Sequence, residues 1–181
     1  MNQKTIFGIA LGAFALSSAT MAIYTPSQAY TKKHLEPSHS PSRSFQIAQA
    51  SSTSAIEQSV HEKINAYRGS KGLSNLTRNS SIDSQARTHS RNMASGNVPF
   101  GHDGFRQRLT NTGLSYSAAA ENVAYNCGSS DPAKTAVDGW LKSSGHRRNI
   151  EGNYNLTGIG VAATTKNNCV YLYFTQIFMK S

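Results

Sequence analysis

Apolar side chains return every three or four positions in three segments of the chain, which places them along one face of an α-helix. Each segment begins with a serine, asparagine or aspartate that can cap a helix N-terminus, and each is followed by a glycine that can end the helix. The pattern therefore predicts amphipathic helices over residues 54–70, 79–96 and 131–143, with a shorter helical piece at 106–110.

The spacing of apolar residues changes toward the C-terminus. Residues 156–164 and 169–178 are rich in β-branched and aromatic side chains, and the polar stretch between them has the composition of a turn. We interpret them as two antiparallel strands in a hairpin, with the segment around Glu121 as a candidate for a further strand. Gly158 and Gly160 would allow another element, for instance the third helix, to approach closely. Helices around a hairpin make a layered α+β domain.

Residues 1–29 have the features of a secretory signal peptide. Lys4 supplies a positive charge ahead of a mostly apolar run, and small residues near position 29 suit cleavage. A membrane anchor is the alternative, but glycines and hydroxyl residues interrupt a run that is already short for a span of about 20 residues. We therefore expect a secreted or periplasmic protein without a stable transmembrane anchor after cleavage.

Residues 30–53 are rich in Ser, Pro, Gln and His and show no apolar period. Such a composition is typical of a disordered linker. The folded domain is therefore expected to occupy residues 54–181, a length that allows one ordinary core and no second domain.

The full chain carries 18 Lys and Arg against 9 Asp and Glu, a formal net charge of +9. Loss of residues 1–29 would remove one of these charges, that of Lys4, and leave +8. The basic residues are dispersed, which argues against a nucleic-acid partner. This positive charge favours adhesion to anionic envelope polymers or membranes, with solubility alone as the alternative.

The chain contains two cysteines, Cys127 and Cys169. In an exported protein such an even pair is typical of one disulfide, which would stabilise the fold by a few kcal/mol. Two free thiols are the alternative. There is no C-x-x-C spacing, so the sequence indicates neither a redox motif nor a thiolate zinc site.

Three polar residues are candidates for chemistry. His102 lies in a loop whose glycines allow its side chain to reach a cavity, and His146 directly follows the break that Ser144-Gly145 make after the third helix. Glu121 follows three alanines, so we expect its carboxylate to be half-buried beside a positive or donor partner. Two of them have a structural alternative: a solvated loop histidine for His102, and an acceptor of loop amides for Glu121.

Two further histidines are assigned structural roles. His61 lies beside the apolar stripe of the first helix and is interpreted as a surface residue. His89 falls on the inward face of the second helix. We expect it to be buried and satisfied by a backbone carbonyl, with a position lining a cleft as the alternative.

An ordered set of segments resembles the CAP superfamily, whose members include cysteine-rich secretory proteins, antigen 5 and plant pathogenesis-related 1 proteins. The resemblance covers residues 56–178 and looks closest to the bacterial branch. It rests on a helix with Asn65-x-x-Arg68, a loop His102, Glu121-Asn122-Val123-Ala124, Trp140-Leu141-Lys142-Ser143-Ser144-Gly145-His146-Arg147-x-Asn149-Ile150, Gly158-Ile159-Gly160-Val161 and Tyr173-Phe174-Thr175-Gln176-Ile177-Phe178.

The resemblance implies a three-layer α-β-α sandwich, with a small antiparallel sheet between helices and an open central cleft. In the eukaryotic branch, two histidines and two acidic residues line that cleft and can hold a divalent metal. Here His102 and Glu121 match one histidine and one acid, whereas Ser143 and Tyr173 stand where the family has its second acid and second histidine. The bacterial pattern supplies His146 instead.

The resemblance therefore implies a cleft lined by His102, Glu121, His146, Ser143 and Tyr173. Two imidazoles and one carboxylate can hold zinc with water in the fourth position, so His102, Glu121 and His146 are the candidate metal ligands and catalytic residues. Without the second acid, fewer groups can orient the ligands or act as a base. A polar cleft that only forms hydrogen bonds is therefore the preferred interpretation.

Three functions follow from these features. The first is a secreted binding module for an envelope polymer, a lipid or other apolar small molecule, or an extracellular protein, in line with the sterol and fatty-acid binding known in the family. The second is a structural extracytoplasmic domain. The third is a metal-assisted, peptidase-like hydrolase using His102, Glu121 and His146, although the sequence has no G-x-S-x-G or H-E-x-x-H pattern.

Overall fold

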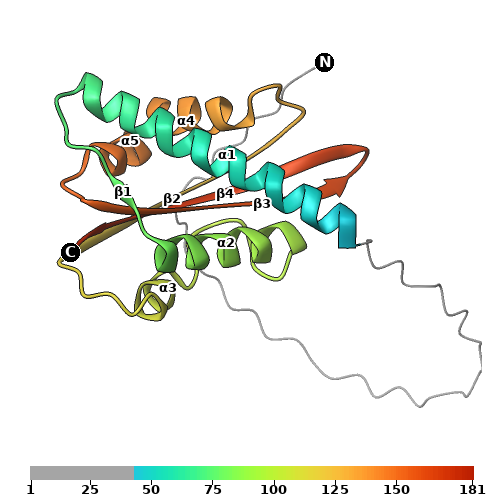
Figure 1. Ribbon diagram of the computed structural model, residues 1–181, viewed down its shortest axis with the longest axis horizontal. Helices are drawn as coiled ribbons and strands as arrows, with labels where there is room; N and C mark the ends of the chain where they lie inside the picture. Colours follow the sequence, from blue (N-terminus) through green and yellow to red (C-terminus); the bar gives the residue numbers. More distant parts are fainter. Residues whose placement is uncertain (1–42) are drawn as a thin grey trace, which may run out of the picture.

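The computed structural model describes the backbone of residues 43–181 and the side chains from residue 52 onward. This part of the chain forms three layers, with helices on both faces of a four-stranded sheet (Figure 1). The predicted α+β class and α-β-α layering are confirmed. The predicted signal peptide (1–29) and the linker residues 30–42 lie outside the described residues, so both stay predictions.

The strands of the sheet lie in the order β1-β3-β4-β2. The predicted hairpin is confirmed as β3 (Leu156–Lys166) and β4 (Cys169–Lys180), and the candidate strand around Glu121 is β2 (Ala118–Cys127), antiparallel to β4. The prediction missed β1 (Thr77–Arg78), which runs parallel to β3, so the sheet is mixed rather than purely antiparallel. A strand of two residues is too short to show a periodic pattern.

The helices are divided between the two faces of the sheet (Figure 1). One face is covered by α1 (Arg43–Ser70), α4 (Pro132–Lys142) and α5 (Ser144–Glu151). The other is covered by α2 (Ser80–Ser95) and α3 (Phe105–Asn111). The predicted caps are confirmed: the side chains of Asn79 and Asp131 accept backbone N–H groups at the start of α2 and α4, and Gly96 ends α2 in the left-handed conformation.

Helix α1 begins at Arg43, well ahead of the predicted start at Ser54, and overlaps the end of the predicted linker. After Pro41 the sequence contains no proline for several turns and is rich in Ala and Gln, both compatible with a helix. A capping pattern therefore does not mark a helix start where the preceding residues can continue the helix. Within residues 43–181, no helix is both long and apolar enough to cross a membrane.

The close approach that Gly158 and Gly160 permit is made by α2, not by the third predicted helix. A Cβ atom added to Gly158 would collide with the backbone at Ile82 and Asp83, and one added to Gly160 would collide with the backbone at Ala86 and Arg87. Glycine at both positions therefore lets α2 lie directly on β3. This contact fixes α2, and with it the loop that carries His102, against the sheet.

Side chains cover the two outer edges of the sheet, where strand N–H and C=O groups lack a neighbouring strand. At the β2 edge, the buried indole Nε1 of Trp140 donates to the carbonyl of Val123 at 3.0 Å. At the β3 edge, β1 pairs only as far as Thr157. Beyond it, carboxylates of Asp83 and Glu57 accept from the backbone N–H groups of Ile159 and Val161, at 2.8 and 3.1 Å.

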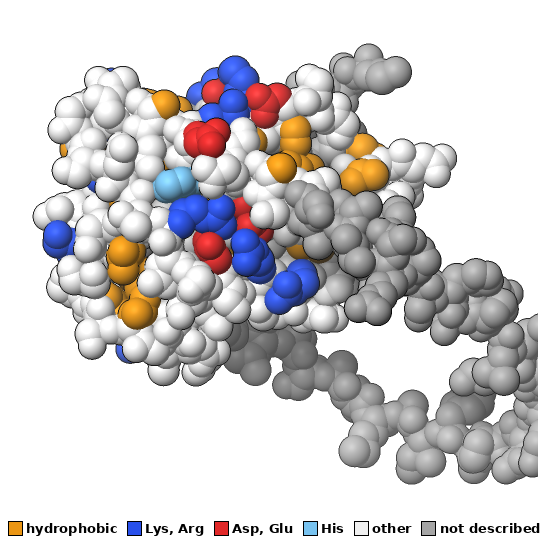
Figure 2. Space-filling model, in the orientation of Figure 1, with side chains coloured by type: hydrophobic (Ala, Val, Ile, Leu, Met, Phe, Trp, Pro, Cys, Tyr) orange, Lys and Arg blue, Asp and Glu red, His pale blue; other side chains and the backbone are white. Residues whose placement is uncertain are grey.

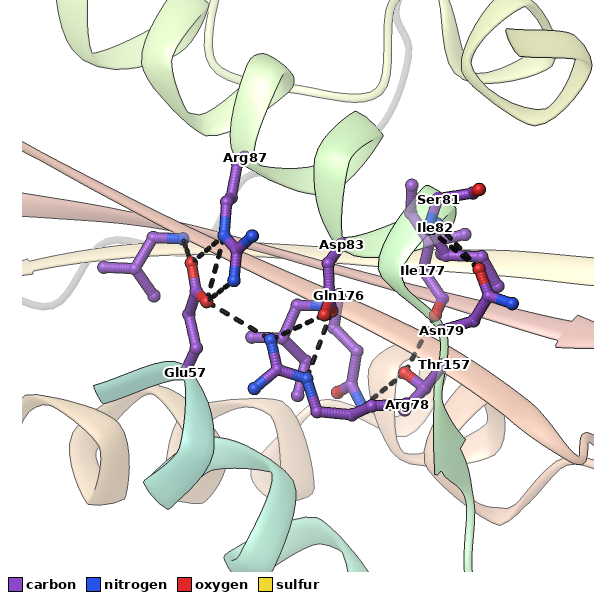
Figure 3. A network of polar contacts seen from close by, with 12 residues as sticks. Glu57, Arg78, Asn79, Ser81, Ile82, Asp83, Arg87, Thr157, Gln176 and Ile177 are labelled. Atoms are coloured by element: carbon purple, nitrogen blue, oxygen red, sulfur yellow. Dashed lines mark hydrogen bonds and ion pairs between the residues drawn. The ribbon is translucent and has the colours of Figure 1, made fainter. Parts of the chain in front are cut away.

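The carboxylates at the β3 edge belong to a charged network between α1 and α2 (Figure 3). Glu57 is only 1% exposed and pairs with Arg87 at 2.6 Å and with Arg78 at 3.2 Å. Arg78 also pairs with Asp83 at 2.9 Å. In the space-filling view, basic and acidic side chains gather over the region where α1 and α2 face each other (Figure 2). The network joins two layers of the sandwich around the edge of the sheet.

The predicted disulfide is present between Cys127 and Cys169. These are the last residue of β2 and the first residue of β4, so the bond ties the end of an outer strand to the hairpin. We expect Cys127→Ser with Cys169→Ser to lower the free energy of unfolding by about 3–4 kcal/mol, because the bond closes a long loop in the unfolded chain. Urea denaturation measures this difference.

Reducing the wild type should reproduce the effect, since the described residues contain no other cysteine pair. The reductant should leave the stability of the double serine variant unchanged. Equal stability of the reduced and oxidised wild type would contradict the prediction.

Candidate functional site

The candidate site lies where the loop before α3, the strand β2 and the helix α5 come together. The loop between α2 and α3 carries His102 and is held at both ends. The buried His89 on α2 donates from Nε2 to the carbonyl of Gly101 at 2.8 Å, which confirms its predicted structural role. After His102, the backbone N–H of Phe105 donates to the carbonyl of His102 at 3.0 Å and starts α3. The position of His102 is therefore fixed by its backbone.

Glu121 on β2 is the centre of the site. Its side chain is 1% exposed, and its two oxygens accept from Arg108 Nε at 2.9 Å and Nη2 at 2.7 Å. His102 Nδ1 lies 3.0 Å from the same carboxylate. The predicted burial of Glu121 beside a positive partner is therefore confirmed, and the partner is Arg108 on α3. Because a carboxylate only accepts, His102 carries its proton on Nδ1 when neutral and presents Nε2 as an acceptor.

Arg108 also holds the loop of His102 in place. Its Nη1 donates to the carbonyl of Asp103 at 2.7 Å, in addition to the two bonds to Glu121. One buried guanidinium therefore joins the loop, α3 and β2. Half of the His102 side chain remains exposed, so its ring is positioned from the protein side and open on the other.

His146 approaches the site from the opposite layer, in the first turn of α5. The chain breaks after α4 at Ser143, just ahead of the predicted Ser144-Gly145, and α5 begins at Ser144, so His146 lies within a helix. Asn122 Nδ2 donates to the carbonyl of His146 at 3.2 Å. Asn149 Nδ2 donates to Asn122 Oδ1 at 2.9 Å and to the free-edge carbonyl of Glu121 at 3.3 Å. These bonds attach α5 to β2 at the level of Glu121.

The other end of α5 is attached to α1. Arg68, which is buried, donates from Nη1 to the carbonyls of Ile150 at 2.7 Å and Gly152 at 2.9 Å. Tyr67 donates its hydroxyl to Glu151 at 2.5 Å. Arg68 and Tyr67 therefore attach the end of α1 to the end of α5.

Asn65, in the same helix, donates to the carbonyl of Leu76 and fixes the chain there. His61 donates to the same carbonyl at 2.9 Å. The prediction that His61 lies free on the surface is therefore wrong, because the residue is half-buried.

The ring of His146 is half-buried and lacks a partner on one nitrogen. Its Nδ1 is inaccessible to solvent and has no hydrogen-bond partner among the described residues. Burial, and next the positive potential of His102, lower the pKa of His146 below the ordinary histidine value. The pKa of His146 therefore lies below that of a solvated histidine, chiefly because its ring is buried.

The structure brings two of the five predicted site residues, His102 and Glu121, into direct contact. His146 is attached through its carbonyl to Asn122, the next residue of β2. Ser143 ends α4 without a side-chain bond to the start of α5. Tyr173 stacks on Tyr125 with ring centroids 5.5 Å apart, beside the site rather than within its hydrogen bonds.

The donor set does not fit the predicted zinc site in this arrangement. Both oxygens of Glu121 accept from Arg108, and the ring nitrogen of His102 nearest to that carboxylate donates to it. Within residues 43–181, no group of three or more His, Cys, Asp or Glu is placed to hold a metal ion. We therefore derive no metal chemistry from this site.

Sequence reasoning missed Arg108 and the role of Asn149. The sequence predicted that Glu121 needs a positive or donor partner, but it did not identify that partner. Arg106 and Arg108 both lie in the short helical piece and are both candidates. Only Arg108 is buried. Asn149 was part of the family resemblance, whereas its bond to the edge of β2 depends on the pairing of strands. No local pattern reports such a bond.

Stability should fall in mild acid because of His89 and His146. Burial is the main cause that lowers the pKa of both residues below the ordinary value of 6.5. As the pH falls below 6.5, the unfolded chain binds protons before the folded chain does, so the unfolded state is favoured. The contribution of the two histidines to the free energy of unfolding is complete above pH 6.5, and it is lost as the pH falls through their lowered pKa values. We expect unfolding midpoints in urea to decrease from pH 7 to pH 5, and less so in His89→Asn. An equally steep decrease in that variant would contradict this assignment.

Comparison with known proteins agrees with this geometry. The model of the cysteine-rich secretory protein family, CAP, matches residues 61–178. The uncharacterized protein YkwD of Bacillus subtilis is 37% identical over 116 residues, which are 61% of this chain and 43% of that protein. The uncharacterized membrane protein YlbC of the same organism is 33% identical over 129 residues, 68% of this chain and 34% of that protein. The chain thus matches less than half the length of these curated relatives.

Solved structures share the fold. An extracellular protein from Bacillus anthracis that contains an SCP domain has a TM-score of 0.61 and 24% identity, covering 83% of this chain and 45% of that chain. A cysteine-rich secretory protein from Staphylococcus aureus has a TM-score of 0.55 and 25% identity, covering 71% of this chain and 39% of that chain. Since the family model spans most of the folded part and the architecture agrees, the chain belongs to the cysteine-rich secretory protein (CAP) family, with relatives in Bacillus and Staphylococcus.

Proposed function

We propose that this protein is a secreted or periplasmic binding module, whose ligand is an envelope polymer, a lipid or other apolar small molecule, or an extracellular protein. The ligand contacts the site formed by His102, Glu121 and His146. The observation that carries this proposal is the ring of His102, which Glu121 holds at Nδ1 while half of the side chain stays exposed. A ring held in this way presents Nε2 to a ligand as a hydrogen-bond acceptor.

The fixed charges of the site favour binding over catalysis. Glu121 is neutralised by Arg108, so its carboxylate is occupied and is not available as a base. The ring of His102 is held by Glu121, and the backbone of His146 is held by Asn122, which limits the entropy lost when a ligand binds. A preorganised imidazole such as that of His102 suits recognition of a polar group by hydrogen bonds.

One observation favours a hydrolase as the second candidate. Glu121 lies 3.0 Å from His102 Nδ1, and a carboxylate in this place orients a histidine whose Nε2 can act as a general base. Among the described residues, however, no serine or threonine hydroxyl is hydrogen-bonded to either histidine. If the protein hydrolyses casein or cell-wall peptides, His102→Gln should abolish that activity.

The binding proposal can be tested by sedimentation with envelope material. The full chain, secreted from Bacillus subtilis and purified from the medium, is mixed with purified cell-wall sacculi and, separately, with phosphatidylglycerol vesicles. We expect one of these fractions to retain the protein. His146→Phe should weaken retention at least tenfold, because phenylalanine keeps the ring and removes its polar atoms.

The matched control is Arg148→Gln, on the exposed face of the same helix. It removes a positive charge but leaves the site intact, so retention should change less than twofold in 0.15 M salt. Equal retention of wild type and His146→Phe would overturn the proposal, whereas a loss in Arg148→Gln alone would indicate adhesion by charge.

A further inference from the structure

Four aromatic side chains form a cluster next to the proposed site. We call Phe100, Tyr125, Tyr171 and Tyr173 the aromatic cluster. Tyr125 and Tyr173 face each other across β2 and β4 and stack at 5.5 Å, and Phe100 packs edge-on against Tyr125 at 5.0 Å. The ring of Tyr171 lies 6.3 Å from Tyr125. All four residues are half-buried.

The cluster lies on the same strand and the same loop as the site of His102 and Glu121. Phe100 precedes His102 by two residues in the loop that His89 anchors. Glu121 and Tyr125 lie on the same face of β2, because side chains alternate along a strand, and four residues span about 13 Å. A ligand that contacts His102 and extends along β2 would therefore meet the aromatic cluster.

The three tyrosines present hydroxyl groups without protein partners. Among the described residues, no hydrogen bond occupies the hydroxyl of Tyr125, Tyr171 or Tyr173, although the rings contact one another. Burial, and the neighbouring phenols, raise the pKa of Tyr125 above its ordinary value. The hydroxyls are therefore free to donate and accept hydrogen bonds.

The chemistry of the cluster selects among ligand classes. The four side chains carry no charge, so they offer no ion pair to the phosphates of nucleic acids or lipids. Half-buried rings with a rim of free hydroxyls instead suit a ligand with alternating C–H faces and hydroxyl groups. Rigid tyrosines supply such contacts at a low cost in conformational entropy. A neutral glycan chain has this chemistry.

We infer that the aromatic cluster is a binding subsite for a neutral glycan chain, which continues from the His102–His146 site along β2 and β4. This inference rests on the proposed binding function and names the class of its ligand. The sugar rings contact the aromatic faces, and the hydroxyls of Tyr125, Tyr171 and Tyr173 bond to those of the glycan.

Calorimetric titration with defined oligosaccharides tests the inference. The full chain, secreted and purified as above, is titrated with hexasaccharides of β-1,4-linked N-acetylglucosamine, β-1,4-linked glucose and α-1,4-linked glucose. We expect at least one of them to bind. The triple variant Tyr125→Phe, Tyr171→Phe, Tyr173→Phe should weaken that binding at least tenfold, because it keeps the rings but removes three hydrogen-bonding groups.

Tyr154→Phe is the matched control. Tyr154 packs against Phe178 in the core cluster on the opposite face of the sheet, so removal of its hydroxyl should change the affinity less than twofold. Unchanged melting temperatures would show that the triple variant is folded. The inference is overturned if no hexasaccharide binds, or if the triple variant binds as the wild type does.

These outcomes are separable from failure of the binding function. If the sacculi or vesicles still retain the wild type but not His146→Phe, while no hexasaccharide binds, the binding proposal stands and the glycan assignment falls. If saccharides bind through the tyrosines and His146→Phe has no effect, the aromatic cluster is a glycan site and the His102–His146 site is not.

Discussion

Replacing Arg108 with methionine is expected to lower the free energy of unfolding by about 3–5 kcal/mol, because it leaves the buried carboxylate of Glu121 without its cationic partner. The two side chains are 10% and 1% exposed, and they share two hydrogen bonds of 2.9 and 2.7 Å. The variant also loses the bond from Arg108 to the carbonyl of Asp103. Urea denaturation measures the change in stability.

Arg106→Met is the matched control, since Arg106 lies exposed on the same helix and the change in net charge is identical. Its effect should stay within about 0.5 kcal/mol. Adding Glu121→Gln to Arg108→Met should recover part of the loss, because the pair is then removed rather than broken. If Arg108→Met is no less stable than the control, Glu121 does not depend on a buried ion pair.

The elements that could be predicted from the sequence are those specified by local chemistry. Helices α2 and α4 were recognised because an apolar stripe and an N-cap act within a few residues, and α2 also ends at a glycine. The hairpin was recognised because its turn contains Asn167 and Asn168, which tolerate positive φ. Where a tertiary contact overrides a local signal, the prediction differed from the structure.

Helix α5 is the clearest example of such a difference. Ser144-Gly145 was interpreted as a break, whereas both residues lie in the first turn of α5. A helix of this length is unstable in isolation, and packing decides whether it forms. Here Asn149 attaches it to β2 and Arg68 attaches it to α1, over distances along the chain that no local pattern covers. The placement of His146 therefore depends on contacts that only the fold provides.

The sequence predicted which residues belong to the candidate site, but it did not predict the hydrogen bonds between them. The family resemblance named His102, Glu121 and His146, and the alanines before Glu121 indicated burial with a partner. The partner determines the chemistry, however. A carboxylate bound by Arg108 is an acceptor that orients His102, whereas an unbound carboxylate would have been a metal ligand. Knowing that Arg108 rather than Arg106 faces β2 requires the orientation of α3.

Replacing Glu57 with alanine is expected to lower the free energy of unfolding by about 3–5 kcal/mol. Glu57 is 1% exposed and accepts from Arg87, Arg78 and the backbone N–H of Val161. Without it, Arg78 keeps only Asp83, Arg87 loses its carboxylate partner, and an edge N–H of β3 loses its acceptor. Glu57→Gln should cost less, because an amide oxygen can still accept from Val161.

Glu62→Ala, on the exposed side of the same helix, is the control and should change stability by less than about 0.5 kcal/mol.

Comparing the Glu57 and Arg108 variants distinguishes a loss of stability from a loss of ligand binding. Glu57 lies at the β3 edge and Glu121 at the β2 edge, on opposite sides of the sheet. A Glu57→Gln protein that remains folded should therefore keep its affinity for the ligand. Arg108→Met should lose affinity even where it is folded, because Arg108 no longer fixes Glu121 and the loop of His102. Equal losses of affinity in both would show that binding depends on overall stability rather than on the buried pair of Arg108 and Glu121.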